Sequence, residues 1–245
     1  MSEHRPPRDP NPPQRRYPKA SPWGIRAYQR LVRAILSITT QLTVRGVEHV
    51  PEHGGCVIAF NHLSHLDGPV LFAVMPRHDV TAVVGAVMAK NPAVKFLIER
   101  TGGVWIERGG NDRQALATVL EELQRGMAVI VSPEGRISPT GALIEGQRGP
   151  VFLADKAEVP IIPVAMTGVE QIVPNLRRLR RTRLTVTIAP PIWVPPPTAG
   201  NHKARVQETT DRLMHAIAAM LPDEYRGHYR EVGADHASSA SAANA

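Results

Sequence analysis

A short segment that follows a run of apolar residues holds a histidine and an aspartate five positions apart, in the order Asn61-His62-Leu63-Ser64-His65-Leu66-Asp67. Positions five apart in a continuous helix do not share a face, so His62 and Asp67 can meet only across a helix start. If Ser64 is the N-cap, Asp67 falls at the third helical position, where exposed N–H groups favour a carboxylate. From there Asp67 would accept the Nδ1 proton of His62 and leave Nε2 free to act as a general base.

Three other interpretations of this segment stay open. Asp67 could merely satisfy a helix start, with His62 an ordinary hydrogen-bonded loop residue. A metal site would use His62, His65 and Asp67, although no second cluster with matching spacing occurs in the chain. Ser64 could be a nucleophile beside a histidine, although no G-x-S-x-G elbow surrounds it. The remaining segments of the chain favour the general base.

Two later loops carry residues suited to binding an anion. Arg108 stands at the end of a predicted strand, and Glu134, Gly135 and Arg136 follow another. Arginine binds phosphate through a bidentate fork, and a glycine lets backbone N–H groups approach an anion closely. With a general base nearby, these residues would form a site for a phosphorylated alcohol. Taken singly, Arg108 could be a surface residue with Glu134 as its salt-bridge partner.

The elements that must position these residues alternate along the chain. We predict strands at Cys56–Phe60, Val80–Val84, Val104–Ile106, Met127–Val131, Ile161–Met166 and Leu184–Ile188. We predict helices up to about Val74, from Asp112 to Gly126, from Pro150 to Lys156 and from about Lys203 to Met220. Strands that are apolar on both faces and separated by helices indicate an α/β fold with a mostly parallel sheet covered by helices. Ligands of such sheets bind at the carboxyl ends of the strands.

The ends of the chain differ from this central part. Residues 23–45 are predicted to form an amphipathic helix, which either packs on the core with a solvated arginine face or lies in a membrane interface. Its polar face carries Arg26, Arg30 and Arg33. Residues 1–22 and 223–245 are predicted to be largely disordered tails, because Pro- and Arg-rich or Ala- and Ser-rich segments bury little apolar area. Residues 46–222 would then form one domain.

Composition limits the classes of protein to consider. The chain has 245 residues, of which 42% are hydrophobic and 21% charged, as in ordinary globular proteins. A single cysteine, Cys56, excludes a disulfide framework and fits a reducing compartment. We find neither a secretory signal nor the ~18 consecutive apolar residues of a membrane span, so we expect a cytoplasmic protein.

The net charge points to an anionic partner. There are 29 Lys and Arg against 22 Asp and Glu, a formal charge of +7. Aromatic residues make up only 4% of the chain and are not interleaved with basic segments, so we expect no nucleic-acid partner. One basic cluster is either a solvated loop or a contact with anionic lipid, and consists of Arg177, Arg178, Arg180, Arg181 and Arg183.

The order of four blocks resembles the glycerophospholipid acyltransferase family, and among its members the 1-acylglycerol-3-phosphate acyltransferases look most similar. The family's N-H-x-S-x-x-D, G-x-x-x-I-x-R, F-P-E-G-T-R-S and V-P-[IV]-[IV]-P-V blocks correspond to Asn61–Asp67, Gly102–Arg108, Ser132–Ser138 and Val159–Val164. The similarity covers about residues 46–191. It implies that the predicted domain is an acyltransferase domain.

The resemblance also implies roles for individual residues. His62 and Asp67 match the base and its orienting carboxylate, while Arg108, Glu134 and Gly135 match positions that bind the acceptor in the family. The third block departs from the family pattern, because Arg136 and Ile137 stand where the family has Thr and Arg. The arginine of this chain therefore stands one position earlier than that of the family. Either its guanidinium still enters the same pocket, or the acceptor of this protein differs from the family's usual lysophosphatidic acid.

The function implied is transfer of a fatty acyl group from acyl-CoA or acyl carrier protein to a lysophospholipid hydroxyl, with 1-acylglycerol 3-phosphate as the first choice of acceptor. No metal or bound cofactor is required, because the acceptor is the nucleophile and the base moves its proton. We expect the protein to lie peripherally on the cytoplasmic face of the membrane. An acyl-thioester hydrolase using the same His–Asp pair, or a non-catalytic membrane-surface adaptor, remains an alternative.

Overall fold

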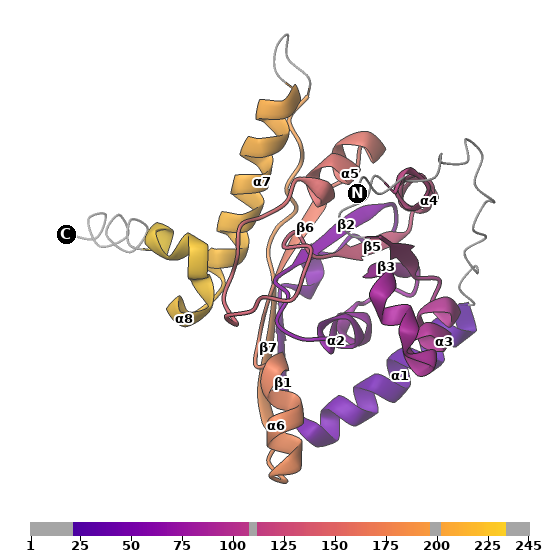
Figure 1. Ribbon diagram of the computed structural model, residues 1–245, viewed down its shortest axis with the longest axis vertical. Helices are drawn as coiled ribbons and strands as arrows, with labels where there is room; N and C mark the ends of the chain where they lie inside the picture. The colour runs from indigo at the N-terminus through magenta and orange to yellow at the C-terminus, as the bar shows by residue number, and fades with distance from the viewer. Residues whose placement is uncertain (1–21, 108–111, 197–201, 234–245) are drawn as a thin grey trace, which may run out of the picture.

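A seven-stranded sheet organises the molecule, with strand order β1-β7-β6-β2-β5-β3-β4 (Figure 1). The computed structural model describes residues 22–107, 112–196 and 202–233. All neighbouring strands run parallel except β6 and β7, which are antiparallel. The strands are β1 (Thr40–Arg45), β2 (Cys56–Phe60), β3 (Val80–Gly85), β4 (Val104–Ile106), β5 (Ala128–Val131), β6 (Ile161–Thr167) and β7 (Thr182–Ile188).

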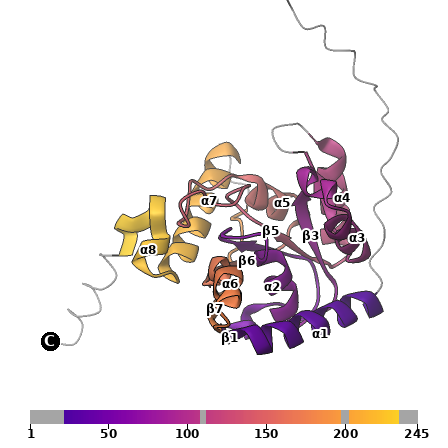
Figure 2. The ribbon, with the colours of Figure 1, turned by 60° about the horizontal axis from the view of Figure 1, so that its bottom comes forward.

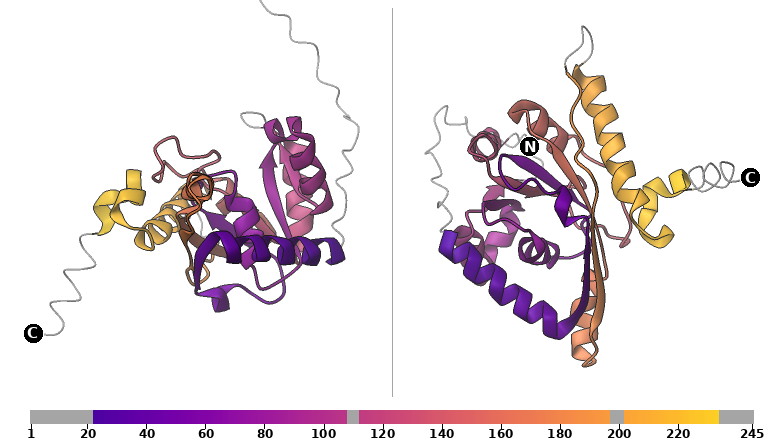
Figure 3. Two further views of the ribbon diagram at one scale, coloured as in Figure 1. Left: turned by 90° about the horizontal axis from the view of Figure 1, so that it is seen from below. Right: turned by 180° about the vertical axis from the view of Figure 1, so that it is seen from behind.

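Helices cover both faces of the sheet because its central strand is apolar on both sides. Every residue of β2 is buried, and its side chains alternate between two core clusters. Helices α1 and α2 pack on one cluster, and α4, α5 and α7 pack on the other (Figures 2 and 3). The helices are α1 (Pro22–Thr39), α2 (Asp67–Val74), α3 (Pro92–Arg100), α4 (Arg113–Gln124), α5 (Gly149–Ala157), α6 (Ile172–Arg177), α7 (His202–Ala219) and α8 (Asp223–Arg226).

The predicted α/β fold is confirmed, and the amphipathic helix is confirmed in part. Helix α1 ends at Thr39, and residues Thr40–Arg45 form β1, whereas the sequence predicted helix through 45. The apolar spacing continues into this segment, but its β-branched residues favour extended backbone. Pairing with β7 then adds the segment to the edge of the sheet. No described helix is long and apolar enough to cross a bilayer.

The C-terminal segment is more ordered than the sequence predicted. Residues 223–233 form α8 and the 3-10 helix η4 (Gly227–Gly233), which pack against α7. Two tyrosines anchor them: the Tyr229 hydroxyl accepts the Gly146 N–H at 3.0 Å, and the Tyr225 hydroxyl donates to Glu170 at 2.8 Å. The prediction of disorder from 223 was therefore wrong for this part, because aromatic anchors stabilise a short segment that composition alone describes poorly. Most of the predicted N-terminal tail and residues 234–245 lie outside the described residues.

Candidate active site

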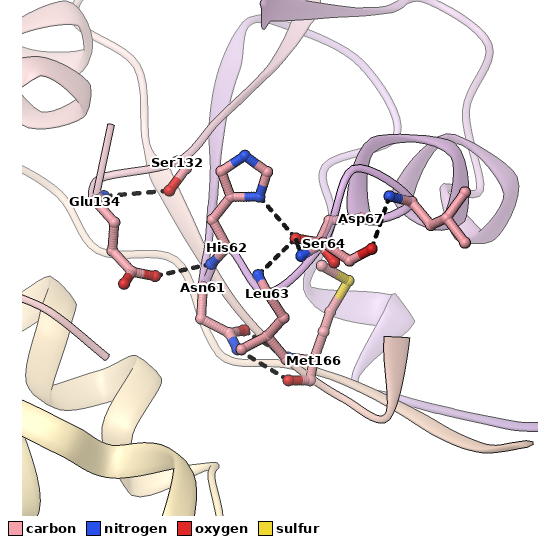
Figure 4. A network of polar contacts seen from close by, with 9 residues as sticks. Asn61, His62, Leu63, Ser64, Asp67, Ser132, Glu134 and Met166 are labelled. Carbon is pink, nitrogen blue, oxygen red and sulfur yellow. Dashed lines mark hydrogen bonds and ion pairs between the residues drawn. The ribbon is translucent and has the colours of Figure 1, made fainter. Parts of the chain in front are cut away.

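An asparagine fixes the direction in which the chain leaves β2. Asn61 is buried, and its side-chain amide donates to the Met166 carbonyl at 2.9 Å and accepts the Met166 N–H at 2.7 Å (Figure 4). This paired contact continues the ladder between β2 and β6 beyond its last backbone pair, Phe60 with Val164. The next residue, His62, is thereby held at the carboxyl end of the sheet.

His62 and Asp67 meet as predicted. The His62 Nδ1 lies 2.7 Å from the Asp67 Oδ2, and this oxygen also accepts the N–H groups of Leu63 at 2.7 Å and Ser64 at 2.8 Å. An ionised carboxylate only accepts hydrogen bonds, so we assign the ring proton to Nδ1. The second ring nitrogen then points away from Asp67 and carries the ring's acceptor lone pair (Figure 4). The arrangement suits a general base.

The helix start differs in detail from the prediction. Asp67 is the first residue of α2 and Leu66 precedes it as the N-cap, so Ser64 is not the cap. Ser64 instead begins a turn, in which its carbonyl accepts the Asp67 N–H at 3.2 Å and its hydroxyl accepts the Leu66 N–H at 3.3 Å. Because of this turn, the carboxylate of Asp67, the first helical residue, lies over the preceding loop and contacts residues 62–64.

Burial makes the Asp67 carboxylate sensitive to the charge on His62. The Asp67 side chain is fully buried, which raises the pKa of its carboxyl group, while hydrogen bonds from His62, Ser64 and Leu63 oppose that rise. Its Oδ1 has no hydrogen-bond partner within the described chain. A poorly solvated carboxylate gains more from an adjacent imidazolium than a hydrated one does. The pair is therefore arranged to stabilise His62 when it takes up a proton.

Glu134 holds the main chain of the histidine. Its side chain is buried; Oε1 accepts the His62 N–H at 2.8 Å and Oε2 accepts the Ile144 N–H at 3.0 Å. Burial raises the pKa of the Glu134 carboxyl group, against the lowering effect of these two bonds. On the other side, the Ser138 N–H donates to the His62 carbonyl at 2.8 Å. The loop after β5 therefore binds both main-chain polar groups of His62.

This geometry gives Glu134 a structural contact beyond the role that the resemblance implies. The resemblance assigned it to acceptor binding, yet each of its carboxylate oxygens is already bonded to a backbone N–H. A carboxylate would also repel the phosphate of an acceptor. Glu134 thus holds the main chain of His62, a contact that sequence patterns could not show because the two residues are 72 positions apart, and its part in acceptor binding stays a prediction.

A cavity of about 650 Å³ lies beside His62 at the carboxyl ends of the strands. It extends from His62 and Ser132 to the first turns of α5 and α7. Most of its lining is apolar, as in sites that take hydrocarbon, and includes Val83, Ile106, Leu116, Val119, Phe152, Leu153 and Val206. Such a cavity can accommodate an alkyl chain whose reactive end lies at His62.

The other residues predicted to bind the acceptor differ in their position relative to the cavity. Gly135 lines the cavity with a φ of +66°, a left-handed conformation that favours glycine. Arg136 is exposed and is not among the lining residues. Arg108 lies outside the described residues. The alternative metal site finds no support, because no three His, Cys, Asp or Glu side chains cluster within the described ranges, and His65 is exposed.

Asn61 has a structural part that was not predicted from the sequence. A signal was present, since an amide stands directly after a strand whose every residue is apolar. A polar side chain at such a buried position must find hydrogen-bond partners. The sequence could not show that the partner would be the main chain of Met166, which is 105 positions away.

The fold and site together define an α/β protein in which a hydrogen-bonded His–Asp pair lies beside an apolar cavity. The chain belongs to the Acyltransferase family, whose model matches residues 41–167, just over half of the chain. The resemblance seen in the sequence blocks is thus confirmed.

Curated relatives carry related names. The 1-acyl-sn-glycerol-3-phosphate acyltransferase alpha of Ovis aries is 27% identical over 199 residues, which is 80% of this chain and 65% of the relative. The beta form of Homo sapiens is 29% identical over 178 residues, 71% of this chain and 62% of the relative. The chain thus spans somewhat less than two thirds of the length of these relatives.

A solved structure shares the fold. The 1-acyl-sn-glycerophosphate (LPA) acyltransferase PlsC from Thermotoga maritima superposes with a TM-score of 0.61 at 23% identity and covers 81% of each chain. At this level of identity the likeness establishes the fold, and it agrees with the mostly parallel sheet described above.

Replacing Glu134 by glutamine is expected to lower kcat by about 10–100-fold with little change in the KM for the acceptor. Glutamine offers one acceptor oxygen, so either the His62 or the Ile144 N–H must face an amide NH₂ group. Steady-state kinetics measure the effect. Glu145→Gln, an exposed residue of the same loop, is the matched control. A raised KM at unchanged kcat would instead assign Glu134 to acceptor binding.

Proposed function

We propose that the protein transfers a fatty acyl group from an acyl thioester to a hydroxyl of a lysophospholipid. The observation that carries this proposal is the His62–Asp67 pair, with the free ring nitrogen of His62 at the end of an apolar cavity. Membership of the Acyltransferase family supports it. The names of the relatives favour 1-acylglycerol 3-phosphate as acceptor, in phospholipid biosynthesis.

The reaction needs one proton to move twice. His62 Nε2 removes the acceptor's hydroxyl proton while the oxygen attacks the thioester carbonyl, and the imidazolium then gives that proton to the departing thiolate as the C–S bond breaks. Asp67 holds the ring through Nδ1 and stabilises the imidazolium between these steps. The acceptor itself is the nucleophile, so the proposed route uses neither an acyl-enzyme nor a metal or bound cofactor.

Each substrate has a place in this scheme. The alkyl chain of the donor, carried by CoA or acyl carrier protein, would occupy the apolar cavity and place its thioester at His62. The acceptor's phosphate would be bound by the backbone at Gly135 and by the guanidinium groups of Arg108 and Arg136, the residues that the sequence predicts for this role. Binding the phosphate would fix the hydroxyl beside Nε2, which contributes to catalysis by positioning.

An acyl-transfer assay tests the reaction and the acceptor together. Purified protein is supplied with acyl-CoA and a panel of lysophospholipids and glycerol 3-phosphate, and both phospholipid and free fatty acid are quantified. We expect phospholipid to form and free acid to stay low. Free acid released at the same rate with and without acceptor would identify a hydrolase, and no consumption of thioester with any acceptor would favour the adaptor.

Helix α1 supports a peripheral position on the membrane. One of its faces packs on α2, where the Tyr28 and Phe72 rings meet edge to face with their centroids 6.0 Å apart, while a second face leaves large apolar side chains in solvent. The exposed fractions are 79% for Trp23, 60% for Leu31, 49% for Ile35 and 75% for Ile38. An exposed apolar stripe flanked by arginines is typical of helices that lie in the interface of a bilayer. We place this face on the cytoplasmic leaflet.

The double substitution Leu31→Asp with Ile38→Asp is expected to reduce binding to lipid vesicles by about 100-fold or more, because two apolar contacts are replaced by charges. Co-sedimentation with vesicles measures the change. The control is Ala117→Asp with Gln124→Asp, which adds the same charge to exposed positions of α4. This helix covers the opposite face of the sheet from α1, so the control variant should bind vesicles like the parent protein. Equal binding by both double variants would remove α1 from the membrane contact.

A further inference from the structure

Helix α6 ends in an exposed tip that carries both apolar and basic side chains. We call residues 173–180 the α6 tip; it links β6 to β7 beyond one end of the sheet (Figure 1). Its large apolar side chains face solvent, with exposed fractions of 45% for Val173, 50% for Leu176 and 94% for Leu179. None of these three contributes to either core cluster.

Leu179 is a leucine at a backbone position that favours glycine. Its φ is +53°, and the turn is closed by the Leu179 N–H on the Leu176 carbonyl at 3.0 Å and the Arg180 N–H on the Asn175 carbonyl at 2.9 Å. Helices that end with this pair of bonds usually place glycine at the left-handed residue, because a Cβ is disfavoured there. Neither backbone conformation nor burial therefore accounts for a leucine at 179.

Within the described residues, the arginines of the α6 tip form no ion pair with an acidic side chain. These arginines, Arg177, Arg178 and Arg180, are all exposed. The nearest acidic residue in the sequence, Glu170, accepts the Tyr225 hydroxyl instead. The α6 tip therefore presents positive charge around its exposed leucines, a combination that is complementary to an anionic and partly apolar surface.

A fourth arginine, just after the α6 tip, bonds to α1. The Arg181 guanidinium donates to the Ser37 carbonyl at 2.8 Å and also to the Thr40 carbonyl, although Arg181 and Ser37 are 144 positions apart in the chain. The two segments approach at the edge of the sheet, where β1 pairs with β7 (Figures 1 and 2). The exposed Ile38 of α1 belongs to this same end of the helix. The segment that follows the α6 tip is thus bonded to the C-terminal end of α1.

We propose that the α6 tip is a second membrane anchor, in which Leu176 and Leu179 enter the interface of an anionic leaflet and the arginines bind lipid phosphates. The proposal rests on the peripheral membrane position inferred above and adds a separate point of contact. One helix lying in an interface leaves the protein free to rotate about the helix axis, whereas two contacts fix the orientation of the sheet. A fixed orientation would keep the carboxyl ends of the strands in a constant relation to the lipid substrate.

Leu179→Gly separates membrane binding from folding. Glycine relieves the left-handed backbone and removes the leucine, so the thermal midpoint should stay the same or rise. Partitioning onto vesicles of phosphatidylcholine and phosphatidylglycerol should fall by about tenfold. Leu179→Phe keeps an apolar side chain at the same backbone conformation and should bind like the parent protein. Binding by Leu179→Gly that equals the parent would overturn the proposal.

The charges are tested by Arg177→Gln, Arg178→Gln and Arg180→Gln combined. This variant should lose most of the preference for anionic over pure phosphatidylcholine vesicles, whereas Arg113→Gln, Arg125→Gln and Arg212→Gln combined should keep it. An undiminished preference, or binding of a short DNA duplex as tight as that of anionic vesicles, would argue against lipid as the partner. Vesicle binding requires no turnover, so these results stand apart from the acyl-transfer assay, which alone decides the proposed reaction.

Discussion

The His62→Ala variant is expected to retain its fold and to lose turnover in acyl transfer by about 10²–10⁴-fold. The imidazole is the group proposed to take the acceptor's proton, since its Nδ1 is held by Asp67, its other nitrogen points away from Asp67, and His62 lines the cavity. Without it, the hydroxyl must attack while still protonated. The thiolate would also leave without a proton donor.

The fold should survive because the loop keeps its other bonds. In the alanine variant Asp67 still accepts the N–H groups of Leu63 and Ser64, and Glu134 still accepts the main-chain N–H of residue 62. Steady-state kinetics with both substrates measure the loss, and circular dichroism and thermal unfolding check the fold. His65→Ala, an exposed neighbour in the same block, is the matched control and should remain active.

A His62→Ala protein that retained a tenth or more of the parent's turnover would contradict the general-base mechanism. Loss of activity in both histidine variants would indicate instead that the whole loop had shifted. Only the combination of an inactive His62 variant, an active His65 variant and an unchanged fold supports the proposed role.

The Arg77→Met variant is expected to lose about 3 kcal/mol of the free energy of unfolding. Arg77 is buried, and its guanidinium uses all its N–H groups. Two bonds go to the Asp79 carboxylate at 2.7 and 2.6 Å, and the others go to the carbonyls of Pro51, Gly54 and Gly126 at 3.0, 2.8 and 2.6 Å. Removing the guanidinium leaves these carbonyls without their donor at the point where three connecting segments meet.

Urea unfolding of the parent and variant proteins measures this loss. Arg77→Lys keeps the charge but has three donors that do not match the planar fork, so it should recover only a small part of the stability. Arg125→Ala removes exposed ion pairs with Glu121 and Glu122 and should change stability by about 0.5 kcal/mol or less. A lysine variant as stable as the parent would show that charge alone, and not the shared hydrogen bonds, accounts for the role of Arg77.

Local patterns were sufficient wherever a residue's environment depends on its neighbours in sequence. The apolar run Cys56–Phe60 became β2 with the predicted bounds, and Val104–Ile106 became β4. Asp112 caps α4 by accepting the Ala115 N–H at 3.0 Å. The contact of His62 with Asp67 could also be predicted from the sequence, since the two residues are five positions apart across a single helix start.

Other features depend on partners that sequence patterns do not identify. The end of α1 at Thr39 was missed because pairing with β7, far along the chain, decides that the next residues are a strand. Glu134 matched a binding position, and only the fold shows that its carboxylate binds the backbone N–H groups of His62 and Ile144. Arg136 could be named from the sequence, whereas its exposed position outside the cavity lining could not.

The sequence by itself determined the α/β class, the order of most strands and helices, and the histidine and carboxylate of the site. Hydrophobic periodicity, capping and short spacings are local properties, so they can be recognised without knowing the fold. Tertiary structure alone decided that Asn61 is fixed by Met166 and that Arg181, just after the α6 tip, bonds to α1. These contacts form only after the sheet brings distant segments together, because any buried polar group bonds to whichever partner the fold places within reach.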